Sequence, residues 1–329
     1  MKKIINDPKT LVADMAKGYA AAYGDIIKVI DNKFVCRATP KEKGKVGVIG
    51  ANGVGHEPCM ISLVGKGLLD VNVMGGIFAA PCGEDVAKGI ELADRGAGVM
   101  VLVSSHAGDI MNARLGALEA MDKGIDTRIV ILWDDIFSAP KEYPDERRGT
   151  AGLFFSWKIV AAAAEAGMQL DELECLAERV RDNTRTLTVA IEAGTHPETG
   201  EKMFCLPEDE IEVGMGVHGE AGTGRMKLTT AKDLVGYMLD NIVRDKPFNA
   251  GDRVLVLLNN CGSMTDMEMY IIYGEIAEYL REKQIDIADK WIGRYSTTQE
   301  MAGFALSLCA VDEEMLRWYK APAETILKF

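Results

Sequence analysis

The sequence predicts an α/β protein of two domains, each with a mostly parallel or mixed central sheet flanked by helices. Two observations lead to this fold class. Short apolar runs alternate with amphipathic stretches, which is typical of buried strands that helices connect and cover. The 329 residues are also too many for one ordinary core, and 48% of them are hydrophobic, so each of two domains can bury an interior. We expect the domains over residues 1–185 and 186–329.

The first half of the chain is predicted from this alternation. We expect a first helix that begins at Pro8, because Asp7 is a good cap and proline suits the first helical position. Gly96 and Gly124 are expected to end two later helices. The predicted strands are 46–49, 99–103 and 128–133, and the other predicted helices are 85–94, 110–123, 152–167 and 171–183.

The second half shows another α/β unit, and no low-complexity linker separates it from the first. We therefore expect the two domains to pack closely together. The predicted strands are 186–193, 211–217, 253–258 and 305–311, and the predicted helices are 231–244 and 266–282.

The charge of the chain restricts its partners. It has 37 Lys and Arg against 50 Asp and Glu, a net charge of −13, which repels nucleic acid and anionic membranes. No run of about 18 apolar residues predicts a membrane span, and the first residues do not form a signal peptide. The seven cysteines show no Cys-x-x-Cys spacing, so we expect no zinc site and a cytoplasmic location.

Two of the four histidines lie in glycine-rich segments that follow predicted strands. His56 follows the run 50–55, and His218 lies between Gly216 and Gly219. Ligands of open parallel sheets bind at the carboxyl ends of strands, and neighbouring glycines let a ligand approach closely and leave the imidazole accessible. Either histidine alone fits an ordinary loop residue, but two in matching contexts favour a binding site.

Asp109 follows the strand 99–103 at the start of a predicted helix. Two interpretations fit this position. The carboxylate caps the helix, or it acts as a general base beside a ligand at the strand end. In both, the helix N-terminus is expected to keep the carboxylate ionised.

The glycine run 50–55 does not match a nucleotide loop. Its order is Gly-x-x-Gly-x-Gly rather than Gly-x-Gly-x-x-Gly, although Asp70 lies near the distance expected for a ribose contact. Glu57-Pro58 is a poor start for the long helix of a dinucleotide site, and no P-loop motif is present. A nicotinamide-dependent dehydrogenase is therefore the least favoured function.

Several motifs occur in combination: His56-Glu57-Pro58, Gly108-Asp109-Ile110, Arg147-Arg148-Gly149, Gly216-Val217-His218-Gly219-Glu220 and Met301-Ala302-Gly303-Phe304. Together they resemble the substrate-binding subunit of phosphotransferase-dependent dihydroxyacetone kinases, and the likeness runs nearly end to end. The resemblance implies α/β sheets in both domains and a homodimer.

The resemblance also implies roles for three residues. A ring nitrogen of His218 bonds to the carbonyl carbon of the substrate as a hemiaminal, Asp109 is the base towards the hydroxyl that is phosphorylated, and His56 assists proton transfer. A neutral imidazole adds to a ketone but not to an alcohol, so capture separates dihydroxyacetone from glycerol. Capture also orients a ligand with too few atoms to be held tightly otherwise.

By the same resemblance, the chain is a phosphotransferase component that is active only with partners. ATP or ADP with Mg resides on a separate nucleotide-binding subunit, which a phosphotransferase-system protein rephosphorylates from phosphoenolpyruvate. The chain itself is expected to bind no cofactor and no metal.

The sequence departs from the family in the pocket. Ser104 stands where relatives have a lysine, and Val54 where they have a serine, so erythrulose is a candidate substrate beside dihydroxyacetone. These departures keep a second function open, a non-catalytic paralogue that binds the ketone as a signal and co-activates a transcription regulator. His106 points into the pocket only if the strand has already ended. The expected substrate-binding residues are Gly53, Val54, Gly55, His56, Ser104, Asp109 and His218.

Overall fold

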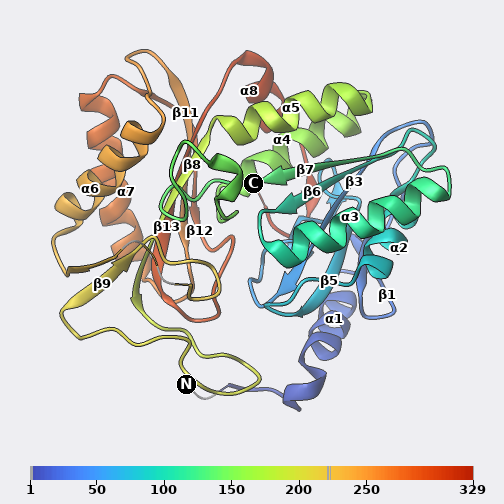
Figure 1. Ribbon diagram of the computed structural model, residues 1–329, viewed down its shortest axis with the longest axis horizontal. Helices are drawn as coiled ribbons and strands as arrows, with labels where there is room; N and C mark the ends of the chain where they lie inside the picture. The colour runs from blue at the N-terminus through green and yellow to red at the C-terminus, as the bar shows by residue number, and fades with distance from the viewer. Residues whose placement is uncertain (1–2, 221, 223, 329) are drawn as a thin grey trace.

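The computed structural model describes residues 3–220, 222 and 224–328, and its main feature is two six-stranded sheets (Figure 1). Both sheets are mixed and flanked by helices, which confirms the predicted fold class. The first sheet has the order β1-β2-β5-β3-β6-β7. The pairs β5–β3, β3–β6 and β6–β7 are parallel, whereas β1–β2 and β2–β5 are antiparallel. Its strands are β1 (Ile27–Ile30), β2 (Phe34–Arg37), β3 (Gly47–Val54), β5 (Val71–Ile77), β6 (Val99–Ser104) and β7 (Thr127–Leu132).

The helices of the first half pack around this sheet. A 3-10 turn at Pro8–Thr10, capped by the Asp7 side chain, leads into α1 (Leu11–Ala22). The helices α2 (Gly83–Ala93) and α3 (Ala107–Asp122) lie side by side on one face of the sheet (Figure 1). A small antiparallel sheet joins β4 (Gly65–Lys66) to β14 (Glu324–Thr325).

The second sheet has the order β10-β9-β8-β13-β11-β12. Its neighbours pair antiparallel except β11 and β12, which are parallel. The helices α6 (Ala231–Asp245) and α7 (Asp266–Glu282) cover its outer face (Figure 1). Its strands are β8 (Thr184–Glu192), β9 (Glu210–Val213), β10 (Gly224–Lys227), β11 (Arg253–Asn260), β12 (Asp286–Gly293) and β13 (Ala302–Ala310).

A buried helix joins the two halves. Every residue of α4 (Leu153–Glu165) except Glu165 is buried, and α5 (Leu170–Asp182) and α8 (Glu313–Tyr319) pack near it. The Phe155 ring of α4 stacks on Trp291 of β12, with ring centroids 5.8 Å apart. One apolar cluster therefore includes residues of both sheets. Since α4 and α5 lie between the last strand of one sheet and the first of the other, we propose to keep the domain division near residue 185.

Some predicted boundaries were wrong. The strand predicted to end at residue 49 continues through the glycine run to Val54. Glycine is suited to these strand positions because neighbouring groups pack closely against the backbone there. A Cβ at Gly50 would lie 1.9 Å from the Met60 side chain. The strand predicted to reach residue 217 ends at Val213, because Gly214 with φ +82° turns the chain out of the sheet. No helix among the described residues combines the length and the apolar character needed to cross a membrane.

Candidate active site

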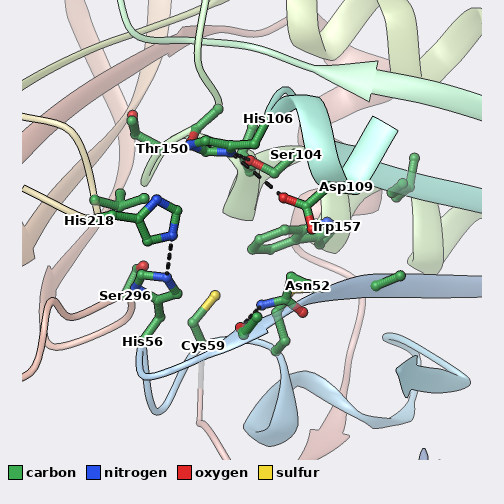
Figure 2. Close-up of a pocket in the computed structure, with 17 residues that line it drawn as sticks. Asn52, His56, Cys59, Ser104, His106, Asp109, Thr150, Trp157, His218 and Ser296 are labelled. Carbon is green, nitrogen blue, oxygen red and sulfur yellow. Dashed lines mark hydrogen bonds and ion pairs between the residues drawn. The ribbon is translucent and has the colours of Figure 1, made fainter. Parts of the chain in front are cut away.

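A cavity opens at the carboxyl ends of β3 and β6, and loops from the second half of the chain close it (Figure 2). The empty space there is about 510 Å³, a value that includes open solvent at the mouth. The loop after β9 contributes His218, and the loop after β12 contributes Ser296. The structure therefore brings His56, Asp109 and His218 to one cavity from positions far apart in the sequence.

His56 and His218 face each other in this cavity. Their Nε2 atoms are 3.2 Å apart (Figure 2). On its other side, the His56 ring contacts the backbone carbonyl of Thr297, with Nδ1 and O 2.8 Å apart. The two imidazoles therefore form part of a continuous hydrogen-bonded chain.

The expectation of two accessible imidazoles was wrong for His56. This residue is only 7% exposed, whereas 27% of the His218 side chain is exposed. Burial and then the charge of His218 lower the pKa of His56 to about 3. The neighbouring Gly55 lets the Phe78 ring pack against the backbone, because a Cβ at Gly55 would lie 2.5 Å from that ring. His56 is therefore neutral at pH 7.

Glu220 had no predicted role, although it lies in the motif around His218. One of its carboxylate oxygens accepts a hydrogen bond from the backbone N–H of His218 at 2.8 Å, and the other lies 2.8 Å from Nδ1 of the same ring. Burial opposes the charge of Glu220, but the hydrogen bonds and the charge of His218 lower its pKa to about 2. Glu220 is therefore ionised and holds both the backbone and the ring of His218.

Asp109 lies in the first turn of α3 but does not cap it. The N-cap position is His106, and Asp109 Oδ1 is buried without a hydrogen-bond partner. The expectation of a carboxylate kept ionised by the helix was wrong near neutrality, because burial raises the pKa of Asp109 to about 7. A carboxyl group with such a pKa can accept a proton at pH 7 more readily than an ordinary aspartate.

His106 points into the cavity, because β6 ends at Ser104 and the chain has already turned (Figure 2). The Ser104 hydroxyl lies 3.0 Å from His106 Nδ1 and 3.3 Å from the carbonyl oxygen of Gly149. Burial and then the charge of His218 lower the pKa of His106 to about 4, so its ring is neutral. Its Nε2 atom is buried and has no partner.

Several unpaired polar atoms face this one cavity. Among the described residues, ten buried side-chain nitrogen or oxygen atoms lack a hydrogen-bond partner, and four of them belong to residues that line it. An unpaired buried polar group costs about 1–3 kcal/mol of stability, so such groups in one cavity indicate a polar ligand. The four atoms are Asn52 Oδ1, His106 Nε2, Asp109 Oδ1 and Trp157 Nε1.

The other predicted binding residues divide into two groups. Gly53 and Ser104 line the cavity, but Val54 and Gly55 do not. Val54 is 4% exposed and packs in the apolar core, so its side chain is directed away from a ligand. Asn52 and Trp157 were missed as site residues, since neither side chain has a sequence signal that distinguishes it from a packing residue.

Donor atoms of His106, His218 and Glu220 lie within 4.8 Å of one another, close enough to raise the question of a metal ion. Two of the three are already paired, because Glu220 bonds to the His218 ring and backbone. In this structure the group consists of a hydrogen-bonded His218–Glu220 pair beside His106.

The Dak1 domain model matches residues 17–327 of the chain. The dihydroxyacetone-binding subunit DhaK of PTS-dependent dihydroxyacetone kinase 1 from Listeria innocua is 36% identical over 327 residues, which are 99% of each chain. D-erythrulose kinase from Mycolicibacterium smegmatis is 34% identical over 99% of this chain and 56% of its own length.

Among solved structures, the dihydroxyacetone kinase operon co-activator Dha-DhaQ superimposes with a TM-score of 0.88. It is 28% identical, over 94% of this chain and 96% of its own. With the family model covering almost the whole length and relatives this similar, the chain belongs to the Dak1 domain family.

Proposed function

We propose that this protein is the ketose-binding subunit of a multi-component dihydroxyacetone kinase. The observation that carries the proposal is the group of unpaired polar atoms beside His218. Asn52, His106 and Asp109 line the cavity, and each has a buried side-chain atom without a hydrogen-bond partner. A short polyhydroxy ketone offers several hydroxyl groups to such atoms and one carbonyl carbon to an imidazole.

His218 is proposed to capture the ketone as a hemiaminal. Its ring is partly exposed in the cavity and is held by Glu220, so it is both reachable and oriented. Addition of a ring nitrogen to a ketone gives a covalent adduct, which an alcohol such as glycerol cannot form. The covalent bond fixes a very small ligand in one orientation for transfer.

Asp109 is proposed as the general base and His56 as the residue that moves a proton at the carbonyl end. A base with a pKa near the working pH combines a useful ionised fraction with sufficient basicity, and Asp109, with its pKa raised to about 7, meets that condition. The 3.2 Å contact between the Nε2 atoms of His56 and His218 supports this role, because it puts the His56 ring beside the proposed nucleophile.

The donor of the phosphoryl group is proposed to be a second, nucleotide-bearing subunit that carries ATP or ADP and Mg. The full-length match to a relative named as a dihydroxyacetone-binding subunit supports this division. By the same family resemblance we propose a cytoplasmic homodimer whose nucleotide subunit is recharged by a phosphotransferase-system protein.

The ketose is proposed to be dihydroxyacetone or a four-carbon relative. The similarity to D-erythrulose kinase supports the larger ligand, and so does Ser104, whose short side chain leaves His106 Nε2 free in the cavity.

The test is turnover in a reconstituted system. The protein is mixed with a Dak-type nucleotide subunit and its phosphoryl donor, and phosphorylation of dihydroxyacetone, erythrulose and glycerol is compared. We expect turnover of a ketose and none of glycerol. Equal turnover of glycerol, or no turnover of any short ketose, contradicts the proposal.

A second candidate is a ketone-binding co-activator of transcription, favoured by the similarity to the structure of such a co-activator. This function requires capture of the ketone without phosphoryl transfer. Ketone capture together with no turnover alongside several nucleotide subunits is the outcome that selects it.

A further inference from the structure

The hydrogen bonds around His218 assign a role to Glu220 that goes beyond binding. We infer that Glu220 is the positioning residue that holds the His218 proton on Nδ1, and so makes Nε2, the atom that faces His56, the nucleophile. The inference rests on the proposed function in one respect, that His218 attacks a ketone. The position of the proton itself does not depend on it.

The loop around Glu220 is built to hold its carboxylate against His218. The backbone N–H of Gly216 donates to the carbonyl of Glu220 at 2.8 Å, and Gly219, with φ +83°, closes the turn. A Cβ at Gly216 would lie 2.1 Å from a Glu220 carboxylate oxygen, so only glycine leaves room for the carboxylate there. With one oxygen on the backbone and one on the ring, the carboxylate fixes the rotation of the imidazole.

Two acceptors then define the protons on the two rings. The Thr297 carbonyl only accepts, so His56 carries a proton on Nδ1. The Glu220 carboxylate also only accepts, so His218 carries a proton on Nδ1 as well. The Nε2 atoms 3.2 Å apart would then be two lone pairs facing each other. A hydrogen bond between these two atoms needs one further proton, with which the pair would carry one positive charge.

His56 holds such a proton only weakly. His56 is buried against a carbonyl and has its pKa lowered to about 3, whereas His218 lies directly against the ionised Glu220. Other titratable groups that interact with His218 are His106, the N-cap residue of α3, and Asp109 in its first turn, and Arg148 lies near His106. His106 is neutral, whereas the Glu220 carboxylate contacts the His218 ring directly, 2.8 Å from Nδ1.

The capture step balances in atoms and charge. As the ketone enters, the proton between the rings moves to His56 Nε2 and frees the lone pair of His218 Nε2. This lone pair attacks the carbonyl carbon, the carbon–oxygen π bond breaks, and its electrons go to the oxygen, which takes the proton from His56. The product has a new N–C bond, a hydroxyl group and a cationic His218 ring whose Nδ1–H still bonds to Glu220. One positive charge is present before and after the step.

The test compares Glu220→Gln with Glu208→Gln, an exposed glutamate of the same half of the chain. The amide offers only one acceptor. The backbone N–H of His218 takes that acceptor, and the amide N–H₂ then faces Nδ1. The His218 proton is therefore expected to move to Nε2, which removes the nucleophile. We expect at least a tenfold smaller adduct fraction at a fixed ketose concentration, measured by intact-protein mass, with Glu208→Gln unchanged.

The second readout is ¹⁵N NMR of the histidine rings in the wild type without ketose. We expect His218 to show Nδ1 protonated, and Glu220→Gln to shift the proton to Nε2. A wild-type Nδ1 without a proton overturns the inference, and so does a folded Glu220→Gln variant that forms the adduct as well as the wild type. If the wild type forms no adduct with any ketose, the proposed function fails, whereas the NMR result still decides the role of Glu220.

Discussion

The Nε2 atoms of His56 and His218 lie 3.2 Å apart, although 162 residues separate the two histidines in the chain. His56 also contacts the carbonyl of Thr297 from the second half of the chain, whereas His218 is held by Glu220 of its own loop. The pair therefore joins the two sheets at the point where a ligand would be captured.

His218→Ala is expected to abolish the covalent ketose adduct and to weaken ketose binding by at least about 10²-fold, since the covalent bond supplies most of the hold on so small a ligand. The fold should remain, because His218 lies in a loop with a partly exposed side chain. Intact-protein mass and calorimetry measure the two effects. His196→Ala is the matched control, because His196 does not line the cavity; an adduct on His218→Ala would show that another residue is the nucleophile.

Asp109→Asn is expected to keep ketose binding and to lose turnover by about 10²–10⁴-fold, because an amide cannot accept the hydroxyl proton. In the reconstituted system, the wild-type rate should rise as the pH passes through about 7, where the carboxyl group ionises. The variant should lose this limb of the pH profile. A variant with wild-type turnover returns Asp109 to a structural role.

The same substitution should affect stability in the opposite direction. The pKa of Asp109 is raised in the folded protein, so the protonated group stabilises the fold at low pH and this contribution is lost as the pH rises through about 7. Asn has no such titration. Asp109→Asn should therefore have a free energy of unfolding roughly 1–3 kcal/mol higher than that of the wild type at pH 8, measured by denaturant titration. The difference should be smaller at pH 4. A larger gain at pH 4 than at pH 8 contradicts the raised pKa.

Ser104→Lys is expected to reverse the preference for a larger ketose. The wild type should bind erythrulose more tightly than dihydroxyacetone, because the short Ser104 side chain leaves His106 Nε2 available in the cavity. A lysine would occupy that space and should lower erythrulose affinity by at least about tenfold, which corresponds to 1.4 kcal/mol. Competition binding with both ketoses measures this. Tighter binding of dihydroxyacetone by the wild type, unchanged in the variant, rejects the role given to His106.

The purified chain with ATP and Mg alone is expected to phosphorylate no ketose, because its glycine run forms a strand rather than a nucleotide loop. Added nucleotide subunit should restore turnover. A ketose phosphate above background without that subunit contradicts this division of labour.

Much of the fold follows from the sequence, since the buried strands β6 and β11 are largely continuous apolar runs and helices such as α6 and α7 begin at side-chain caps. The failures have physical causes. The strand β12 was missed because it lies at the sheet edge and alternates charged and apolar residues with few buried side chains. The prediction ended β3 at residue 49 because glycine is rare in strands, whereas Gly53 lets the backbone of Ala79 approach the strand.

The candidate site was only partly predictable. Motifs identified His56, Asp109 and His218, but the part played by Thr297 is a backbone carbonyl, which no residue type can signal. The role of Glu220 depends on a turn that needs Gly216, and it becomes visible only when the loop is folded.

The most direct test of the central claim is NMR of the protein labelled with ¹⁵N-histidine and mixed with a ketose labelled with ¹³C at its carbonyl carbon. A hemiaminal on His218 predicts a one-bond coupling between that carbon and one ring nitrogen, assigned to Nε2, in the wild type and none in His218→Ala. A bound ketose whose carbonyl carbon shows no coupling to any histidine nitrogen would contradict covalent capture.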